Sequence, residues 1–223
     1  MYKYDTHVHT SEASACASLS GAGQVKLYKK LGYSGIIVTD HFFNGNSTVP
    51  KKLLWEERVQ RFSMGYEHAL EAGKRNGLSV FFGWEESIQG ADFLVYGLSK
   101  EWLLKHPEIL SWNIGEHYTR IHSEGGYIVH AHPFRNSDII ADIRLYPEYE
   151  DAIEIINASH KNPEYNQRAI EYAKLHHKPV TGGSDAHHAD TDHAGMIFNH
   201  ELKDIRDFIN CVECKKDITV ISI

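Results

Sequence analysis

Histidines and carboxylates recur in this sequence at spacings that suit metal binding. The segment "DTHVHT" places His7 and His9 two residues apart at the end of a strand-like stretch. Side chains at positions i and i+2 of a strand lie on the same face, so these two imidazoles would be aimed at one point. An H-x-H pair by itself also fits an exposed edge strand, and the ends of the other strands decide between the two interpretations.

The same residue types end four further apolar stretches of the chain. They are Asp40 and His41, Glu85 and Glu86, His130 and His132, and Asp185 and His187. In a parallel barrel the carboxyl ends of the strands converge on one rim, which is where barrel enzymes carry their catalytic groups. Five such endings favour a metal centre over incidental histidines.

The ligand types limit the choice of metal and the number of ions. Imidazole and carboxylate ligands without cysteine suit Zn²⁺, Mn²⁺ or Fe. At least six candidate ligands exceed the three or four that a single catalytic zinc takes from a protein. The sequence therefore predicts a cluster of two or three divalent ions, in which a carboxylate such as Glu85 could bridge two of them.

Alternating strands and helices must position these residues. Apolar stretches predict strands at 2–9, 34–41, 78–85, 92–98, 127–133, 152–159 and 178–187. Helical stretches are predicted at about 21–31, 51–76, 108–124, 163–177 and 201–211. Several of the helices stop at glycine, which relieves the left-handed cap position. This order predicts a mainly parallel α/β architecture.

Composition indicates one domain and excludes several classes of partner. The 223 residues are 42% hydrophobic, enough for one sizeable core, and we expect a single catalytic domain over 1–223. No apolar run approaches the ~20 residues of a membrane span, and the N-terminus lacks the pattern of a signal sequence. The three cysteines suit reduced thiols, so a cytoplasmic location is expected. The net charge of −7 disfavours strong binding to nucleic acid or anionic membrane. The single C-x-x-C at Cys211 and Cys214 is more typical of a helix end than of a zinc or redox site.

Five motifs, in order over nearly the whole chain, resemble those of the polymerase and histidinol phosphatase (PHP) superfamily: "DTHVHT", "TDH", "GWE", "AHPFR" and "GGSDAH". The resemblance implies a distorted (β/α)7 TIM-like barrel, with a trinuclear metal centre at the C-terminal ends of the strands that hydrolyses phosphate esters. By motif, His7 and His9 would share an ion with Glu85 and Asp185. Glu85 would bridge to an ion that also takes His132, and the remaining ion would take His41 and His187.

The sequence departs from the family pattern at two ligand positions. The family often has Asp or His five or six residues beyond the H-x-H pair, but "HTSEASA" has Ser14 at the Asp position. We expect Glu12 to substitute, the alternative being an exposed loop glutamate. Many members also supply a histidine after the position of Glu85, and here Asp92 is the candidate, the alternative being an ordinary turn residue.

Several polar residues near these motifs are candidates for supporting roles. Arg135 follows "HP", where a guanidinium could take a phosphoryl group through two parallel hydrogen bonds, unless it forms a surface salt bridge. His193 lies in a polar loop and could protonate a leaving group. Asp5 and Asp40 flank ligands and could orient an imidazole. His130 is expected to be a hydrogen-bonded core histidine.

The leading functional hypothesis is a metal-dependent phosphoesterase that acts on a small-molecule phosphate ester through a metal-activated hydroxide. Because ion binding needs neutral imidazoles, activity should fall on acidification. An amidohydrolase-like metal hydrolase acting on a carbonyl substrate and a non-catalytic PHP module are the competing hypotheses. The sequence identifies neither the particular ester nor the oligomeric state.

Overall fold

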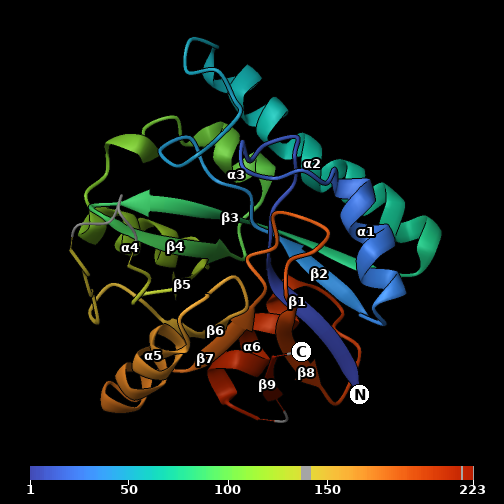
Figure 1. The fold of residues 1–223 in the computed structure, drawn as a ribbon. Helices are drawn as coiled ribbons and strands as arrows, with labels where there is room; N and C mark the ends of the chain where they lie inside the picture. Colours follow the sequence, from blue (N-terminus) through green and yellow to red (C-terminus); the bar gives the residue numbers. More distant parts are fainter. Residues whose placement is uncertain (137–141, 217, 223) are drawn as a thin grey trace.

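The computed structural model describes residues 1–136, 142–216 and 218–222, and its architecture is mixed α/β (Figure 1). The strands are β1 (Tyr2–Val8), β2 (Gly35–Val38), β3 (Ser79–Ile88), β4 (Ala91–Tyr96), β5 (Tyr127–Ala131), β6 (Ala152–Asn157), β7 (Val180–Gly183), β8 (Ala194–Phe198) and β9 (Ile218–Ser222). The helices are α1 (Gly21–Lys30), α2 (Trp55–Asn76), α3 (Lys100–Lys105), α4 (Ile114–Ser123), α5 (Pro163–Leu175) and α6 (Ile205–Cys214), with a 3₁₀ turn, η1, at Ile109–Ser111.

The strands form one nine-stranded sheet in the order β7-β6-β5-β4-β3-β2-β1-β8-β9. Strand β7 also lies against β1, β8 and β9, so the sheet curls into a nearly closed barrel. The predicted barrel-like α/β class is therefore confirmed. The strand number differs from the expected seven because β8 and β9 add an antiparallel hairpin beside β1.

Parallel pairing occurs only within the group β1, β2 and β3 and within the group β5, β6 and β7. This corrects the expectation of a mainly parallel sheet. The pairs β1–β2, β2–β3, β5–β6 and β6–β7 are parallel, whereas β4 is antiparallel to both neighbours. Gln89 and Gly90, both at positive φ, are the two residues between β3 and β4. A two-residue connection permits only a hairpin, because a parallel crossover needs a dozen or more residues.

Helices cover the outside of the sheet and fix the loops that follow the strands. Figure 1 shows α1 and α2 side by side along one flank, and these two helices pack on each other and on β2 and β3. Helix α5 packs on β6, and α6 contributes Phe208 and Val212 to the hydrophobic cluster around Tyr4 and Met196. Gly77 caps the C-terminus of helix α2, and its φ of 64° is the left-handed conformation that the sequence predicted there.

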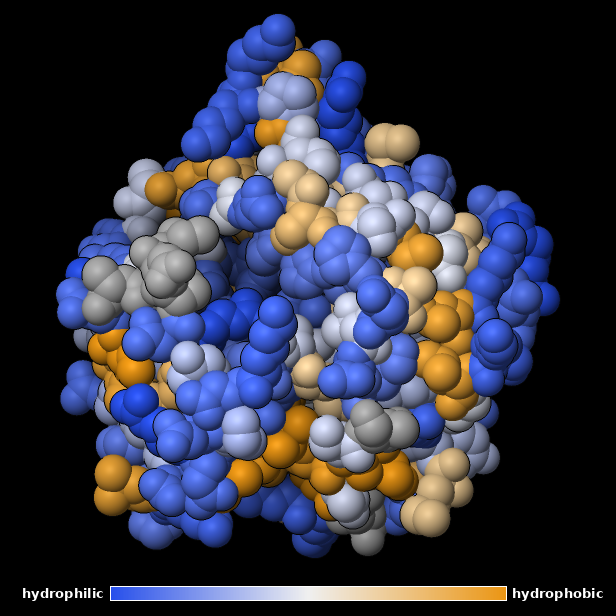
Figure 2. Space-filling model, in the orientation of Figure 1, coloured by the Kyte–Doolittle hydropathy of each residue, from blue (hydrophilic) through white to orange (hydrophobic). Residues whose placement is uncertain are grey.

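The face seen in Figure 2 is mostly hydrophilic and is hollowed near its middle. No helix in the described ranges is long and apolar enough to cross a membrane.

Candidate metal centre

Seven of the nine predicted ligands meet at the strand ends. His7 is on β1 and His9 follows it, His41 follows β2, Glu85 is on β3, His132 follows β5, and Asp185 and His187 follow β7. Three overlapping groups of potential ligand atoms result, with all atoms of a group within 4.8 Å of one another: His7, Glu85 and His132; His7, His9 and Asp185; and His9, His41 and His187. Most of these side chains are buried.

The side chains of His7 and His9 are directed at one point, as their i, i+2 spacing predicted. His7 Nε2 and His9 Nε2 lie 3.1 Å apart, and both residues are fully buried. Glu154 Oε1 is 2.9 Å from His7 Nδ1, so the carboxylate places the His7 proton on Nδ1. Lone pairs on the two Nε2 atoms would then face each other, which requires a cation or a shared proton between them.

The tautomer of His9 is set by a short relay. Asp40 Oδ1 accepts the hydroxyl proton of Ser14 at 2.7 Å, and the Ser14 oxygen in turn accepts from His9 Nδ1 at 3.0 Å. Asp40 is itself held by the backbone N–H and hydroxyl of Thr10. The relay therefore leaves the lone pair of His9 Nε2 facing the cluster, and it gives Asp40 the orienting position that was expected for it.

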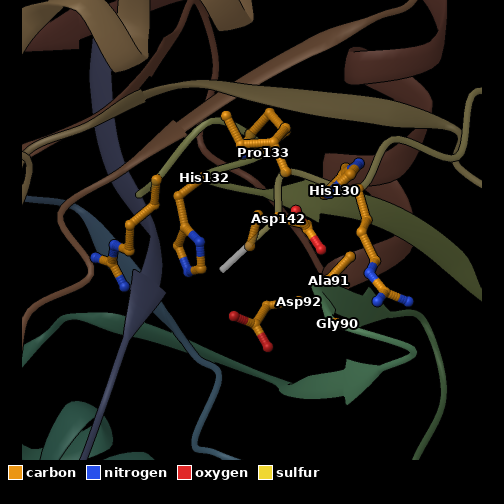
Figure 3. Close-up of a pocket in the computed structure, with 11 residues that line it drawn as sticks. Gly90, Ala91, Asp92, His130, His132, Pro133 and Asp142 are labelled. Atoms are coloured by element: carbon orange, nitrogen blue, oxygen red, sulfur yellow. The ribbon is translucent and has the colours of Figure 1, made fainter. Parts of the chain in front are cut away.

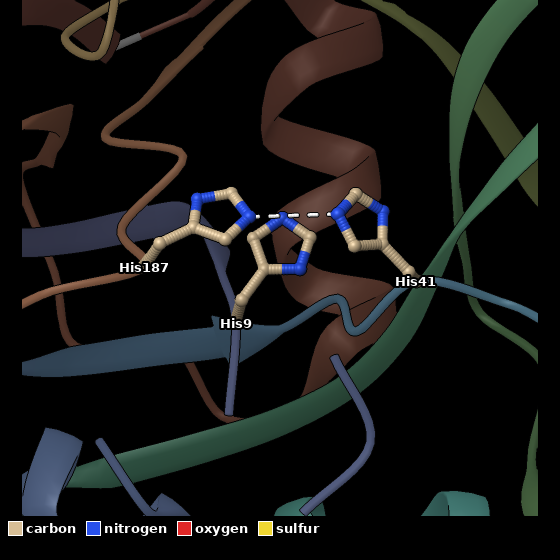
Figure 4. A group of neighbouring side chains, drawn as sticks. All are labelled: His9, His41 and His187. Carbon is tan, nitrogen blue, oxygen red and sulfur yellow. Dashed lines mark hydrogen bonds between the residues drawn. The ribbon is translucent and has the colours of Figure 1, made fainter. Parts of the chain in front are cut away.

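His41 and His187 complete a second group around His9 (Figure 4). His187 Nδ1 donates to the carbonyl oxygen of Asp185 at 2.8 Å, because a carbonyl can only accept. His187 Nε2 then presents its lone pair to His41 Nε2, 3.4 Å away. The side chains of His41 and His187 are 18% and 17% exposed, so solvent reaches the cluster on this side.

Two buried carboxylates complete the centre. Glu85 Oε1 contacts His132 Nε2 at 2.9 Å, and His41 Nδ1 lies 2.6 Å from Glu85 Oε2. Glu85 Oε2 and Asp185 Oδ1 are both buried, and imidazole nitrogens lie next to them: His41 Nδ1 beside Glu85 Oε2, and His9 Nε2 at 3.2 Å from Asp185 Oδ1. An ionised oxygen in that position is strongly unfavourable unless a cation satisfies it.

Opposite charges shift the pKa values of the cluster strongly. Burial alone would lower the pKa of His7, but Glu154, Asp185 and Glu85 raise it well above its usual value. Burial and the neighbouring His41 and His187 lower the pKa of His9 well below its usual value. Burial would raise the pKa of Asp185, but Arg135 and His7 hold it well below the usual range. The protein thus presents adjacent anionic carboxylates and a neutral imidazole at one point.

The buried carboxylate oxygens, the facing imidazole nitrogens and the donor set together fit divalent transition metals. Imidazole and carboxylate suit Zn²⁺, Mn²⁺ and Fe. Three overlapping groups of potential ligand atoms offer room for more than one ion.

Arg135 lies at the edge of this centre. Its Nη2 donates to Ser159 Oγ at 2.5 Å and to Asp185, so it is not a peripheral salt bridge. Its side chain is 29% exposed and lines a cleft with Asp92 and His132. Figure 3 shows the side chains of Asp92 and His132 directed toward the same space.

Glu12 is not brought to the centre, which corrects its prediction as a ligand. Its carboxylate accepts from the Gly21 N–H at the start of α1 and contacts His68 Nδ1 at 2.9 Å. The favourable interaction of a carboxylate with a helix N-terminus explains this direction. Ser14 occupies the position facing His9 instead.

Asp92 is also held away from the three ligand groups. Its carboxylate accepts from Ser87 Oγ at 2.5 Å across the β3–β4 hairpin. Because Asp92 pairs with Ala131 in the sheet, it faces the cleft beside His132 without joining the potential ligand atoms.

His193 does not lie on the rim, contrary to its predicted role as a proton donor. Its ring packs against those of Tyr28 and Tyr33, at centroid distances of 5.4 and 6.4 Å. It directly precedes β8, whose first residue, Ala194, accepts a hydrogen bond through its carbonyl oxygen from the Tyr33 hydroxyl at 2.8 Å. Burial lowers the pKa of His193, which further disfavours a protonated donor.

His130 is the hydrogen-bonded core histidine that was expected, with Nδ1 2.6 Å from Glu150 Oε2. His132 lies beyond the end of β5 at Ala131 and has a φ of 31°, so the regular alternation of side chains along the strand does not extend to it.

The sequence analysis missed Glu154 and Cys16. Glu154 contacts His7 Nδ1 and accepts from the backbone N–H of His132 at 3.0 Å. A glutamate inside the apolar strand "AIEIIN" was the available signal. Burial would raise the pKa of the Cys16 thiol, but interaction with His187 and His41 lowers it to about 6. Only its place shortly after the H-x-H pair pointed to the site.

The curled α/β sheet, with histidines and carboxylates at its strand ends, is a fold that this chain shares with proteins described as PHP-like. The predicted resemblance to the PHP superfamily is confirmed by the comparisons. A family model described as PHP-associated (PHP_C) matches residues 163–191, which include Asp185 and His187. No curated protein matches the sequence.

Solved structures share this fold. One is a two-domain protein from Bacteroides vulgatus containing a predicted PHP-like metal-dependent phosphoesterase, at 14% identity and a TM-score of 0.75 over 99% of this chain. This chain spans 64% of that protein's length, less than two thirds. A proposed metal-dependent phosphoesterase from Bifidobacterium adolescentis is 17% identical, with a TM-score of 0.61, and 95% of this chain and 96% of that chain are covered. An amidohydrolase from Chromobacterium violaceum with bound sulfate and no metal is 15% identical, with a TM-score of 0.57 and coverage of 83% and 87%.

Proposed function

We propose that this protein is a metal-dependent phosphoesterase that hydrolyses a phosphate ester of a small metabolite or nucleotide. The observation that carries the proposal is the cluster itself: the Nε2 atoms of His7 and His9 face each other 3.1 Å apart, beside the buried carboxylates of Glu85 and Asp185. We further propose that two or three ions of Mn, Zn or Fe are held by His7, His9, His41, Glu85, His132, Asp185 and His187.

Such ions would supply positive charge for an anionic transition state and lower the pKa of a coordinated water to about 7. The chain supplies the remaining functions. Glu154, Ser14 and Asp40 fix imidazole tautomers so that nitrogen lone pairs face inward.

In this proposal Arg135 binds the phosphoryl group. Among the described residues, only Nη2 of its guanidinium has hydrogen-bond partners, Ser159 and Asp185, which leaves Nε and Nη1 for an anion. A planar guanidinium can donate two parallel hydrogen bonds to phosphate oxygens. The sulfate in the Chromobacterium violaceum structure supports an oxyanion ligand for this fold.

The similarity to that amidohydrolase supports a second candidate function, hydrolysis of a carbonyl substrate. Activity on phosphate esters, compared with amides and lactones under the same metal loading, separates the two. A cytoplasmic location and the absence of membrane and strong nucleic-acid partners remain part of the proposal.

The test is metal removal and reloading. Chelation should abolish hydrolysis of p-nitrophenyl phosphate, and Mn²⁺, Zn²⁺ or Fe²⁺ should restore it. His7→Ala and Asp185→Ala should lose both bound metal and rate. His122→Ala, which removes an exposed imidazole that contacts Asp151, is the matched control and should keep both. Full activity of the metal-free protein would overturn the proposal.

A further inference from the structure

His200, Asp207 and Cys211 form a further group of potential metal ligands, apart from the candidate centre. One ligand atom from each residue lies within 4.8 Å of the other two, and the cysteine atom is Sγ. Asp207 and Cys211 are both on α6, four residues apart, the spacing that places two side chains on one face of a helix. His200 approaches them from the loop between β8 and α6. An imidazole, a carboxylate and a thiol thus meet at one point.

This group lies at the other end of the barrel from the candidate centre. Strand β8 is antiparallel to β1, and its last residue, Phe198, pairs with Tyr2 at the start of β1. His7, which belongs to the centre, is five residues further along β1, and that length of strand spans about 16 Å. The group therefore cannot share an ion with the centre.

A hydrogen bond from outside the group sets the proton position of His200. Its Nδ1 lies 2.8 Å from Asn199 Oδ1, an amide oxygen that can only accept, so Nδ1 carries the proton. Histidines that bind metal characteristically donate their second ring N–H in this way. The lone pair of His200 Nε2 then faces Asp207 Oδ2 at 3.1 Å, and two acceptors at this distance require a proton or a metal ion between them.

Further hydrogen bonds hold the loop and the start of the helix in place around this pair. The N–H of Lys203 donates to Asp207 Oδ2 at 3.1 Å, and the N–H of Asp207 donates at 2.8 Å to Asp204 Oδ1, the N-cap of α6. The N–H of Leu202 donates at 3.0 Å to the hydroxyl of the buried Tyr4. The loop is thereby anchored both to the helix and to the core.

We infer that His200, Asp207 and Cys211 bind one zinc ion, in addition to the ions of the proposed centre, with a water molecule as its fourth ligand. Zinc takes nitrogen, oxygen and sulfur ligands, and bonds of roughly 2.0–2.3 Å in a tetrahedron set ligand atoms about 3.3–3.7 Å apart. The separations in this group are close enough for small side-chain rotations to reach that geometry. The thiol proton passes to solvent as the zinc–sulfur bond forms, because only the thiolate binds metal. The ion links the β8–α6 loop to α6.

The test is the absorption spectrum of the cobalt-substituted protein in a Cys16→Ser background, which removes the thiol that interacts with His41 and His187. Co²⁺ bound to a thiolate gives an intense sulfur-to-metal charge-transfer band in the near ultraviolet. We expect this band in Cys16→Ser and its loss in Cys16→Ser/Cys211→Ser.

Cys214→Ser in the same background is the matched control. Cys214 is on the same helix, three residues from Cys211, but does not belong to the ligand group, so this control should keep the band. His200→Gln changes an exposed side chain, and equilibrium dialysis of this variant against micromolar Zn²⁺ should show one bound equivalent fewer than in wild type. No band in Cys16→Ser, a band that survives Cys211→Ser, or an unchanged zinc content in His200→Gln would overturn the inference.

The spectrum reports on metal ligation whether or not the protein hydrolyses phosphate esters. A band that depends on Cys211 in a protein without phosphoesterase activity would leave this inference standing while refuting the proposed reaction. An active enzyme without the band would do the reverse.

Discussion

At the scale of single residues, the candidate centre depends on partners that set proton positions. Glu154 is 1% exposed and makes two contacts with the cluster, one to His7 Nδ1 and one to the backbone of His132. Burial would raise its pKa, but His7 holds the pKa of this carboxyl below its usual value. An ionised Glu154 keeps the proton of His7 on Nδ1.

Glu154→Gln should therefore weaken metal binding while leaving the fold intact. The amide can still contact His7, but without the charge that fixes its tautomer, and loss of such a partner typically reduces metal affinity by about 10- to 100-fold. Titration with a competing chelator measures the change. Glu150→Gln is the matched control, because Glu150 is an equally buried glutamate that contacts His130 and Tyr172 instead. Equal metal affinity in wild type and Glu154→Gln would contradict this role.

Arg135 permits a separate prediction, because its proposed partner is the substrate. Arg135→Ala should retain metal but lose about 10- to 150-fold in kcat/KM, since hydrogen bonds to charged groups contribute roughly 1.5–3 kcal/mol. Arg135→Lys should recover only part, because an ammonium cannot make two parallel hydrogen bonds. Steady-state kinetics with a metal assay measures both. Wild-type kinetics in Arg135→Ala would remove the residue from the site.

At the scale of secondary-structure elements, the packing of α2 against the loops supports the centre. Gly65 of α2 is buried against Thr10 and Asp40, and a Cβ there would lie 1.9 Å from Thr10 Oγ1 and 2.9 Å from Asp40 Oδ2. Asp40 is the carboxylate that orients His9 through Ser14. The absence of a side chain at Gly65 thus leaves the space in which Thr10 and Asp40 form the relay.

Gly65→Ala should destabilise the protein by about 1–3 kcal/mol, the usual effect of overpacking. Denaturant unfolding of the metal-free protein measures it. Gly115→Ala on α4 is the control: its Cβ would meet no atom closer than 3.4 Å, so it should be neutral or stabilise by up to about 1 kcal/mol. Equal losses in the two variants would show that space at Gly65 is not limiting.

Local pattern predicted the elements better than their pairing. The strand ends that carry His7, His41 and Asp185 could be predicted because apolar stretches and their polar endings are local features of the chain. The hairpin of β8 and β9 was not predicted, since β8 joins the sheet through β1, nearly two hundred residues earlier. The path of the segment around Cys16 likewise depends on backbone hydrogen bonds from Ala15 to Asn46 and from Ser18 to His187, which no local pattern reveals.

At the scale of the whole molecule, buried ionisable groups make stability depend on pH in two opposing ways. Burial raises the pKa of Asp5 and Asp40 from 3.8 to about 6. Their contribution to stability is fully present below 3.8 and is lost as the pH rises through about 6. Burial, with the neighbouring His132 and Arg135, lowers the pKa of His160 from 6.5 to about 4. Its contribution is present above 6.5 and is lost as the pH falls through about 4.

The two effects should partly cancel in the wild-type protein between about pH 4 and 6, and replacing His160 should expose the difference. In His160→Gln, the unfolded chain no longer gains a proton at this position that the folded chain resists. The free energy of unfolding of the metal-free variant, relative to wild type, should therefore increase as the pH falls from 6.5 to about 4. Above 6.5 the difference should stay constant, because the imidazole is then neutral in both states. Denaturant unfolding across this range measures the difference, and parallel curves for the two proteins would show that His160 takes up its proton as readily in the folded protein as in the unfolded chain.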